Sequence, residues 1–321
     1  MSDTKKFFIA GGAGFIGSHL AQALLERGEV TVFDNLSSGR MEHLAPHSAH
    51  PRFRFIKGEI GDLGALTDAM RGQSLVGHFA ANPDIARSMI ETDLDLREGT
   101  ILTYNVLEAM RRNGVREILY PSGSGIYGDL GTVPTAEDFG PLLPISMYGA
   151  SKMACEGLIS AFCHMFGMRG WVFRFANVVG ERQTHGVGYD FINKLQADPT
   201  RLEILGDGRQ SKSYIHVSDV ISAMLFTYAN ARERINVFNV ATDDYLEVSA
   251  IAKIVIEEMQ LEGVDLRYSG GDRGWKGDVP KVRFNLNKIH SLGWRSKHNS
   301  PAAIRRSVKE MLKAISSGGG R

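Results

Sequence analysis

The feature that most constrains the fold is a glycine-rich stretch near the N-terminus, Gly11–Gly17, which reads GGAGFIG. An apolar run over Lys6–Ala10 precedes it and predicts a short buried strand. After it, apolar residues recur every three or four positions as far as Leu24, which predicts a helix. A strand, a glycine turn and a helix in this order are typical of the first unit of a doubly wound parallel sheet.

The next part of the chain repeats this alternation. Apolar runs predict strands over Val30–Phe33, Phe53–Ile56, Leu75–Ala80 and around Ile118–Tyr120, and helical spacing predicts helices over Leu63–Met70 and Leu94–Met110. The alternation predicts an α/β protein with a Rossmann-type doubly wound parallel sheet. It weakens beyond residue 175, so we expect one domain over residues 1–175 and a smaller α/β domain over 176–321. The border between them is soft, and the chain can cross from one domain to the other more than once.

Composition excludes several classes of function. The chain has 37 Lys and Arg against 36 Asp and Glu in 321 residues, so its net charge of +1 argues against nucleic acid or an anionic membrane as main partner. We find no apolar run long enough to span a bilayer and no export signal. Cys155 and Cys163 are eight residues apart on a predicted helix, too far for a disulfide, and two free thiols are typical of the cytoplasm.

The glycine stretch also has a chemical meaning. Gly11, Gly14 and Gly17 form the pattern G-x-x-G-x-x-G, which lets a backbone approach a pyrophosphate at the N-terminus of a helix. Asp34 ends the second predicted strand, 17 residues after Gly17. A carboxylate there accepts hydrogen bonds from an adenosine ribose and repels a 2′-phosphate, so the pattern predicts NAD rather than NADP.

A second motif supplies acid–base chemistry. Tyr148 and Lys152 are four residues apart, so on a helix their side chains share one face. We expect the ammonium to favour the phenolate and to lower the pKa of the tyrosine. A phenolate of this kind can take a proton from a sugar hydroxyl while a hydride leaves the carbon.

Together with Phe79-Ala80-Ala81, these motifs resemble those of the extended short-chain dehydrogenase/reductase family. Within it the chain is most similar to NAD-dependent nucleotide-sugar epimerases and dehydratases, and above all to UDP-glucose (UDP-galactose) 4-epimerases. The similarity continues through Arg174–Gly180, Gly206–Gln210, Tyr214–Val217 and Gly277–Pro280.

The resemblance implies site residues by position. For NAD these are Gly11, Gly14, Phe15, Ile16, Gly17, Asp34, Asn35, Ser38, Gly39, Glu59, Ile60, Phe79, Ala80, Ala81, Ser122, Tyr148, Lys152 and Phe175. For the nucleotide sugar they are Arg87, Ser124, Tyr148, Asn177, Lys212, Arg273 and Asp278. Lys212 and Trp275 stand where relatives often carry arginine, and Arg273 lies two residues before Trp275.

No metal is expected. His43, His47 and His50 are close in sequence, but Pro46 interrupts any helix that could align them, and no Asp or Cys nearby completes a zinc set. We expect these histidines in a solvated loop.

The segment Pro121–Gly128 bears on the type of reaction. Relatives place a catalytic hydroxyl four residues before the tyrosine, where this chain has Gly123. We expect glycines in this turn to rotate Ser124 into the pocket as the replacement, with Ser122 as the next choice. In a third reading both serines only line the pocket. Dehydratases and decarboxylases of the family carry carboxylates here and this segment has none, which favours epimerisation.

The resemblance therefore implies an NAD-dependent nucleoside-diphosphate-sugar 4-epimerase. Tyr148 takes the proton from O4, the C4 hydride passes to NAD and returns to the other face of the rotated 4-keto sugar, and Lys152 holds the nicotinamide ribose. A homodimer through Leu94–Met110 and Tyr148–Phe166 is expected. Two rival readings are an enzyme for another NDP-sugar (a uronic acid, N-acetylhexosamine or heptose, or a 4-oxidase or reductase) and an NAD-binding regulatory protein with blunted chemistry.

Overall fold

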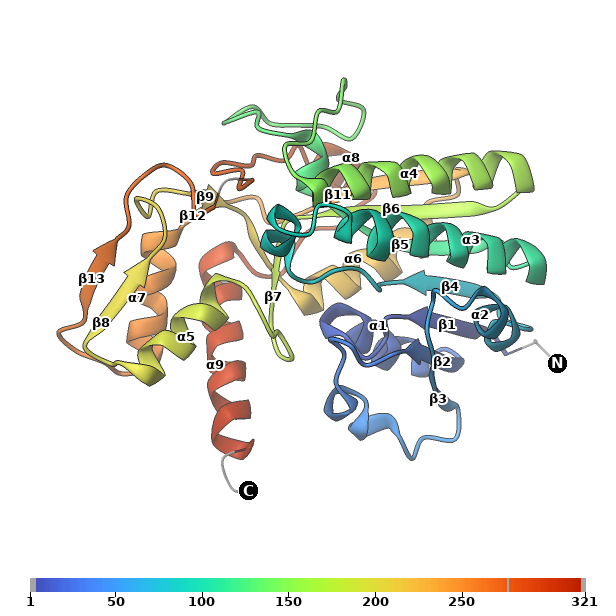
Figure 1. The fold of residues 1–321 in the computed structure, drawn as a ribbon, viewed down its shortest axis with the longest axis horizontal. Coiled ribbons are helices and arrows are strands. Elements are labelled where there is room, and N and C mark those ends of the chain that lie inside the picture. Colours follow the sequence, from blue (N-terminus) through green and yellow to red (C-terminus); the bar gives the residue numbers. More distant parts are fainter. Residues whose placement is uncertain (1–3, 276, 319–321) are drawn as a thin grey trace. The chain divides into compact units, whose positions relative to one another are not determined.

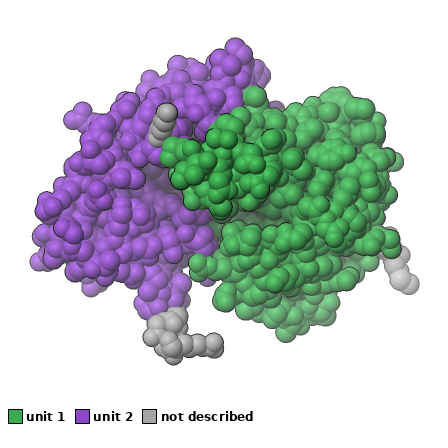
Figure 2. All heavy atoms as spheres, viewed as in Figure 1, with its two compact units in different colours: residues 1–126, 147–174, 224–238 green, residues 127–146, 175–223, 239–321 purple. Residues whose placement is uncertain are grey.

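A computed structural model describes residues 4–275 and 277–318. The chain divides into two compact units, and each is built from three separate segments (Figure 2). Unit 1 takes its described residues from 1–126, 147–174 and 224–238, and unit 2 takes its described residues from 127–146, 175–223 and 239–321.

Unit 1 is organised around a seven-stranded sheet (Figure 1). The strand order is β11 (Ile235–Val240), β6 (Arg169–Phe175), β5 (Glu117–Gly123), β4 (Leu75–His78), β1 (Lys6–Ala10), β2 (Glu29–Asp34) and β3 (Phe53–Lys57). The pairs β1–β2, β1–β4, β2–β3 and β4–β5 are parallel. Ala10 pairs with both Phe33 and His78, so the carboxyl ends of these strands meet at one edge, where open α/β sheets bind ligands.

Helices cover both faces of this sheet (Figure 1). On one face lie α2 (Leu63–Ala69), α3 (Leu102–Asn113) and α4 (Met147–Phe166), which bury a core with apolar side chains of the strands. On the other face α1 (Phe15–Leu25) packs on β1 and β2. Short helical turns connect these elements: η1 (Met41–His43), η2 (Ala45–His47), η3 (Ile85–Met89), η4 (Leu96–Ile101) and η5 (Ser124–Tyr127).

Unit 2 consists of small strand pairs and helices. The pairs are β7 (Asn177–Val179) with β10 (Tyr214–His216), β8 (Arg201–Ile204) with β13 (Asp265–Tyr268), and β9 (Ser211–Lys212) with β12 (Leu246–Glu247). The helices are α5 (Val187–Ala197), α7 (Val248–Glu258), α8 (Asn287–Ser291) and α9 (Ser300–Gly318), and α6 (Val217–Asn230) continues into unit 1. Apolar residues of α5, α7 and α9 form its core with β8.

The predicted fold class is confirmed. One predicted helix is different: Leu94–Met110 is not a single α-helix, because Leu96–Ile101 forms a π-helical turn before α3 begins. Gly99 in this turn lies against Ser151 of α4, where a Cβ would collide with the serine hydroxyl. Within the described ranges, every helix is too short or too polar to cross a bilayer.

Candidate active site

The glycine loop closes tightly between β1 and α1. Gly11 has a positive φ of 79°, and a Cβ there would collide with the backbone of Ala80. A Cβ on Gly17 would collide with the carbonyl oxygen of Gly11. Helix α1 begins after Gly14 without a side-chain cap. The first N–H groups of a helix have no partner within it, so this end is available to an anion such as a pyrophosphate.

Asp34 joins the glycine loop to the loop after β2. One carboxylate oxygen accepts a hydrogen bond from the Ala13 amide at 2.9 Å, and the other accepts one from the Leu36 amide at 2.8 Å. The residue is only 7% exposed. Nearby, the Asn35 amide donates to the Glu59 carboxylate at 3.0 Å. Asp34 therefore sets the shape of the loop as well as placing a negative charge at the carboxyl end of β2.

One of the three neighbouring histidines corrects an expectation. His43 does not lie in a solvated loop: it is buried, and its Nδ1 lies 2.8 Å from the Ala13 carbonyl oxygen. The short turns η1 and η2 make this possible, because they fold the segment back onto the glycine loop. His43 thus braces the loop that the sequence identified.

The Tyr148–Lys152 pair lies in the first turns of α4, beside the end of β5. Lys152 is 6% exposed, and its Nζ donates a hydrogen bond to the Pro121 carbonyl oxygen at 2.8 Å. The same Nζ lies 5.5 Å from the centroid of the Tyr148 ring. The helix therefore places phenol and ammonium on one face, as their spacing predicts.

Burial changes the acidity of both groups. It lowers the pKa of Lys152 from its usual 10.5 to about 8. Burial, and after it the charge of Asp95, raises the pKa of Tyr148 above its usual value. The pKa of Tyr148 therefore lies above its usual value and not below it as the spacing predicts, because burial disfavours the charged phenolate.

The serine segment spans the end of β5 and the turn η5. Ser122 is 4% exposed, and its Oγ has no hydrogen-bond partner among the residues that the structure describes. Ser124 is half-buried in η5. Gly123 has no positive φ, and a Cβ there would meet nothing within 4 Å. Gly125 has no positive φ either, so the two glycines that flank Ser124 lack the unusual dihedrals expected to rotate it, and the buried, unsatisfied hydroxyl makes Ser122 the stronger candidate.

A buried acid next to this pair escaped the sequence analysis. Asp95 is 2% exposed and accepts hydrogen bonds from the Ser88 hydroxyl and, at 3.1 Å, from the Asn82 amide. Its backbone carbonyl accepts one from Ser151 of α4 at 2.7 Å. Asp95 thereby fastens the loop after β4 to α4. No motif around Asp95 in the sequence indicates this role, since its hydrogen-bond partners lie up to 56 residues away.

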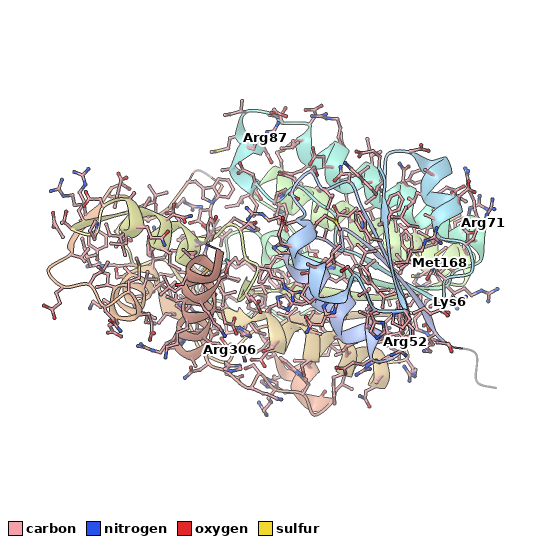
Figure 3. The ribbon with its side chains drawn as sticks, turned by 90° about the horizontal axis from the view of Figure 1, so that it is seen from below. Lys6, Arg52, Arg71, Arg87, Met168 and Arg306 are labelled. Carbon is pink, nitrogen blue, oxygen red and sulfur yellow. The ribbon has the colours of Figure 1, made fainter. Side chains whose placement is uncertain are left out.

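Arg87, on the same loop, points away from these groups. Figure 3 shows its side chain directed outward from the ribbon, and it is 54% exposed and paired with Glu91 at 2.7 Å. The loop itself is anchored by Asn82, which bonds the Asp84 amide at 2.9 Å. This arrangement gives no support to Arg87 as a phosphate ligand.

The predicted nucleotide-sugar residues of unit 2 form a paired cluster. Lys212 Nζ lies 2.5 Å from Asp278 Oδ1, and both side chains are largely buried. Arg273 donates to the Asp278 carbonyl at 2.7 Å and to the Asp129 carboxylate at 2.6 Å. Asp129 was not predicted as a site residue, because 144 residues separate it from Arg273. Elsewhere in this unit, Asn177 is exposed at the start of β7 and Phe175 is buried.

The site residues fit a dinucleotide and show no metal centre. The tight glycine loop, the uncapped start of α1 and the charged Asp34 together match the adenosine diphosphate part of such a cofactor. Within residues 4–275 and 277–318, His, Cys, Asp and Glu side chains form no group of three that could hold a metal ion.

Comparisons with known proteins agree with this geometry. A sequence model of the NAD dependent epimerase/dehydratase family matches residues 7–241. A dTDP-glucose 4,6-dehydratase from an Actinoplanes species is 34% identical, over 90% of this chain and 97% of its own. A UDP-glucose 4-epimerase from Lacticaseibacillus casei is 31% identical, over 91% and 92%. A crystal structure of a UDP-galactose 4-epimerase superposes with a TM-score of 0.86 at 36% identity, covering 97% of this chain and 99% of that one.

Proposed function

Because the chain belongs to the NAD-dependent epimerase/dehydratase family, we propose that it is a nucleoside-diphosphate-sugar 4-epimerase of the UDP-glucose/UDP-galactose type. It is an NAD-dependent enzyme, and the proposal concerns the reaction that it catalyses. The observation that carries it is the Tyr148–Lys152 pair beside a serine segment without a carboxylate. Relatives that carry the names of epimerases and of dehydratases match at similar identity, so the proposal of an epimerase rests on the chemistry of the site.

The acids around the serine segment argue against dehydration. Elimination of water from a 4-keto sugar needs an acid and a base at the neighbouring carbons. The segment Pro121–Gly128 has no carboxylate, and Asp129, the next residue, is paired with Arg273. Asp95 is buried and bonded to Ser88 and Asn82. A reversible oxidation at C4 requires only Tyr148 as acid and base.

The chain's own residues supply the proton chemistry. When bound, NAD would supply the hydride acceptor and, in its reduced form, the hydride donor. Tyr148 takes the proton from the sugar O4 and later returns it, so its phenol must lose and regain one proton in each cycle. Lys152 holds the nicotinamide ribose and places a positive charge 5.5 Å from the Tyr148 ring, which favours the phenolate over what burial alone would allow. Ser122 offers a hydroxyl to O4.

We assign the nucleotide end of the substrate to the cluster in unit 2. Lys212 and Arg273 are the cations for the diphosphate, and Asp278 accepts hydrogen bonds from the nucleotide ribose. Lys212 acts as a point charge, since an ammonium lacks the two-pronged geometry of a guanidinium. The ion pairs with Asp278 and Asp129 hold both cations in defined positions.

We further propose a homodimer formed through the helices α3 and α4. Large apolar side chains are exposed on this part of unit 1: Ile101 is 47%, Tyr104 45%, Met165 73% and Phe166 41% exposed. Phe162 connects them, since its ring lies 6.2 Å from that of Tyr104 and 5.1 Å from that of Phe166. Exposed apolar side chains of this size, two of them joined through the Phe162 ring, fit a protein–protein interface.

The reaction is tested with purified protein and UDP-galactose. We expect conversion to UDP-glucose with no net formation of NADH, because the hydride returns to the carbon that lost it. Stoichiometric NADH would indicate a dehydrogenase, and a product lighter by one water in mass spectrometry would indicate a dehydratase. Turnover of a uronic acid, an N-acetylhexosamine or a heptose derivative alone would reassign the sugar. No turnover of any NDP-sugar would favour a regulatory protein.

The assignment of Tyr148 has its own test. Tyr148→Phe keeps the ring and removes the hydroxyl, so we expect NAD binding to persist while turnover falls by roughly 10²- to 10⁴-fold, the usual range for acid–base groups. Tyr268→Phe is a matched control, since Tyr268 is a partly exposed tyrosine on β13. Similar turnover in the two variants would refute Tyr148 as the acid–base group.

A further inference from the structure

We infer that Tyr120 is a positioning residue whose ring holds the Lys152 ammonium in place through a cation–π contact. The inference rests on the proposed function in one respect only, namely that Lys152 is the cation of the catalytic pair. Tyr120 lies on β5 below the helix that carries the pair, and no sequence motif pointed to it.

The geometry shows how the contact works. Lys152 Nζ lies 4.8 Å from the centroid of the Tyr120 ring, closer than the 5.5 Å that separates it from the Tyr148 ring. This is within the distance at which a ring face attracts a cation. The next residue on β5, Pro121, accepts the hydrogen bond from the same Nζ at 2.8 Å. Two consecutive residues of one strand therefore fix the ammonium, one through its ring and one through its carbonyl.

The surroundings of Lys152 make this contact important, because the two carboxylates that act on its ammonium are bonded to other side chains. The titratable groups that act on it are Asp95, from the segment before α3, and Cys155 and Glu156, from α4. Asp95 is bonded to Ser88 and Asn82, and Glu156 is paired with Arg174 at 2.8 Å. His78, on β4, also faces Lys152, and burial keeps it neutral.

Tyr120 itself is held rigidly. It is 2% exposed, lies in the central part of the sheet and packs against the His78 ring at a centroid distance of 5.8 Å. A buried ring of this kind has little freedom to rotate away from its contact. Since cation–π attraction is strongest where water is excluded, the buried Lys152 gains more from this ring than a surface lysine would.

The test changes the electronics of the ring while keeping its shape. In the full chain with bound NAD, position 120 is replaced by phenylalanine and by 3,4,5-trifluorophenylalanine. Fluorine withdraws electrons from the ring face and so weakens the cation–π contact. The pKa of Lys152 is followed through the ¹³C shift of its labelled ε-carbon, assigned with Lys152→Arg, and kcat and KM are measured across pH with the sugar substrate.

We expect Tyr120→Phe to keep the pKa of Lys152 and the pH profile of kcat that the wild type has. The fluorinated variant should lower the pKa of Lys152 by about one unit, since an attraction of this size favours the charged form by roughly that much. The alkaline limb of kcat should move down with it, while KM changes little. Phe8→Leu, a buried ring on β1, is the control for lost packing and should lower stability without moving the pH profile.

The outcomes separate the possible failures. If the pKa of Lys152 is the same with the two replacement rings, the inference is wrong, whatever the activity. If Tyr120→Phe alone lowers the pKa of Lys152 as far as the fluorinated variant does, the hydroxyl matters rather than the ring, and the inference is also wrong. If the wild type turns over no nucleotide sugar, the proposed function fails, but the titration of Lys152 still decides the role of Tyr120.

Discussion

Lys212 and Asp278 form a close ion pair, with 2.5 Å between Nζ and Oδ1, although 66 residues separate them in the sequence. A cation assigned to the diphosphate and an acid assigned to the ribose are thus direct neighbours. The two residues therefore form a unit, in which removal of one leaves the other as an uncompensated, partly buried charge.

This pairing predicts the effect of Lys212→Met. We expect UDP to bind at least about 10-fold more weakly, since a hydrogen bond to a charged group contributes roughly 1.5–3 kcal/mol, whereas uridine should lose little affinity. Asp278→Asn in the Lys212→Met background should restore part of the UDP affinity, because it removes the unpaired negative charge. Calorimetric titration measures both ligands, with the exposed Lys309→Met on α9 as control. Equal losses for UDP and uridine would contradict a phosphate role.

The pH profile of turnover should depend on Lys152. Burial raises the pKa of Tyr148. A positive charge near the ring favours the phenolate, so we expect the Lys152 ammonium to oppose this effect. Lys152→Met removes that charge, so the acidic limb of kcat should move to higher pH, and part of the lost activity should return in alkaline buffer. Rates measured from neutral to alkaline pH check this. A limb that stays in place would show that Lys152 does not act on the tyrosine.

The serine segment makes a graded prediction. Ser122→Ala should slow turnover by roughly 10- to 150-fold, the equivalent of about 1.5–3 kcal/mol for a hydrogen bond that strengthens with charge on O4. Ser124→Ala should have a milder effect. Because a Cβ at Gly123 would meet nothing within 4 Å, Gly123→Ser should be tolerated and should restore activity to Ser122→Ala. If Ser124→Ala slows turnover more than Ser122→Ala does, Ser124 and not Ser122 supplies the hydroxyl that bonds the sugar O4.

Cofactor choice should depend on the charge of Asp34. Asp34→Asn keeps a group that can accept one loop hydrogen bond, but it removes the negative charge that repels a 2′-phosphate. We expect weaker NAD binding and a preference for NAD over NADP that narrows by about 10-fold, the equivalent of roughly 1.4 kcal/mol. Calorimetry with both cofactors measures the ratio, with Asp62→Asn at the start of α2 as control. An unchanged ratio would count against Asp34 as the selective group.

His78 should make the protein sensitive to acid. Burial, and after it the charge of Lys152, lowers the pKa of His78 from 6.5 to about 3, so the folded state keeps it neutral. Between these values the unfolded chain binds a proton that the folded chain does not, so stability falls as the pH drops below 6.5. Near pH 4.5 the penalty is roughly 2–3 kcal/mol. His78→Gln should reduce this acid-induced loss in urea unfolding, whereas His164→Gln, at an exposed position, should not.

Much of the fold could be predicted from local patterns. The expected helix over Leu63–Met70 and the observed α2, Leu63–Ala69, differ by one residue, because a short amphipathic helix carries its period in its own sequence. The π-helical turn Leu96–Ile101 could not be predicted, since it depends on the close approach of Gly99 to Ser151 of α4. Sequence patterns report local periods, not contacts with distant elements.

The same distinction applies to the site. Tyr148 and Lys152 were found because four residues on a helix fix their relation. Tyr120 and Asp95 were missed because tertiary contacts within unit 1 bring them near Lys152 and Tyr148, and Asp129 was missed because its partner Arg273 in unit 2 is distant in sequence. Ser122 was ranked below Ser124 because the burial of a hydroxyl at the end of a strand cannot be read from its neighbours.

The strand order of the sheet has a consequence for synthesis on the ribosome. β6 lies between β5 and β11, but β6 ends at Phe175 and β11 ends at Val240, 240 − 175 = 65 residues later. At about 5–20 residues per second, roughly 3–13 s pass before the outer neighbour of β6 has been made. During this time β6 is an open edge that can pair with another nascent chain. Slow translation of residues 176–240 would lengthen this interval, so the speed of the ribosome over this stretch bears directly on how much of the protein escapes aggregation.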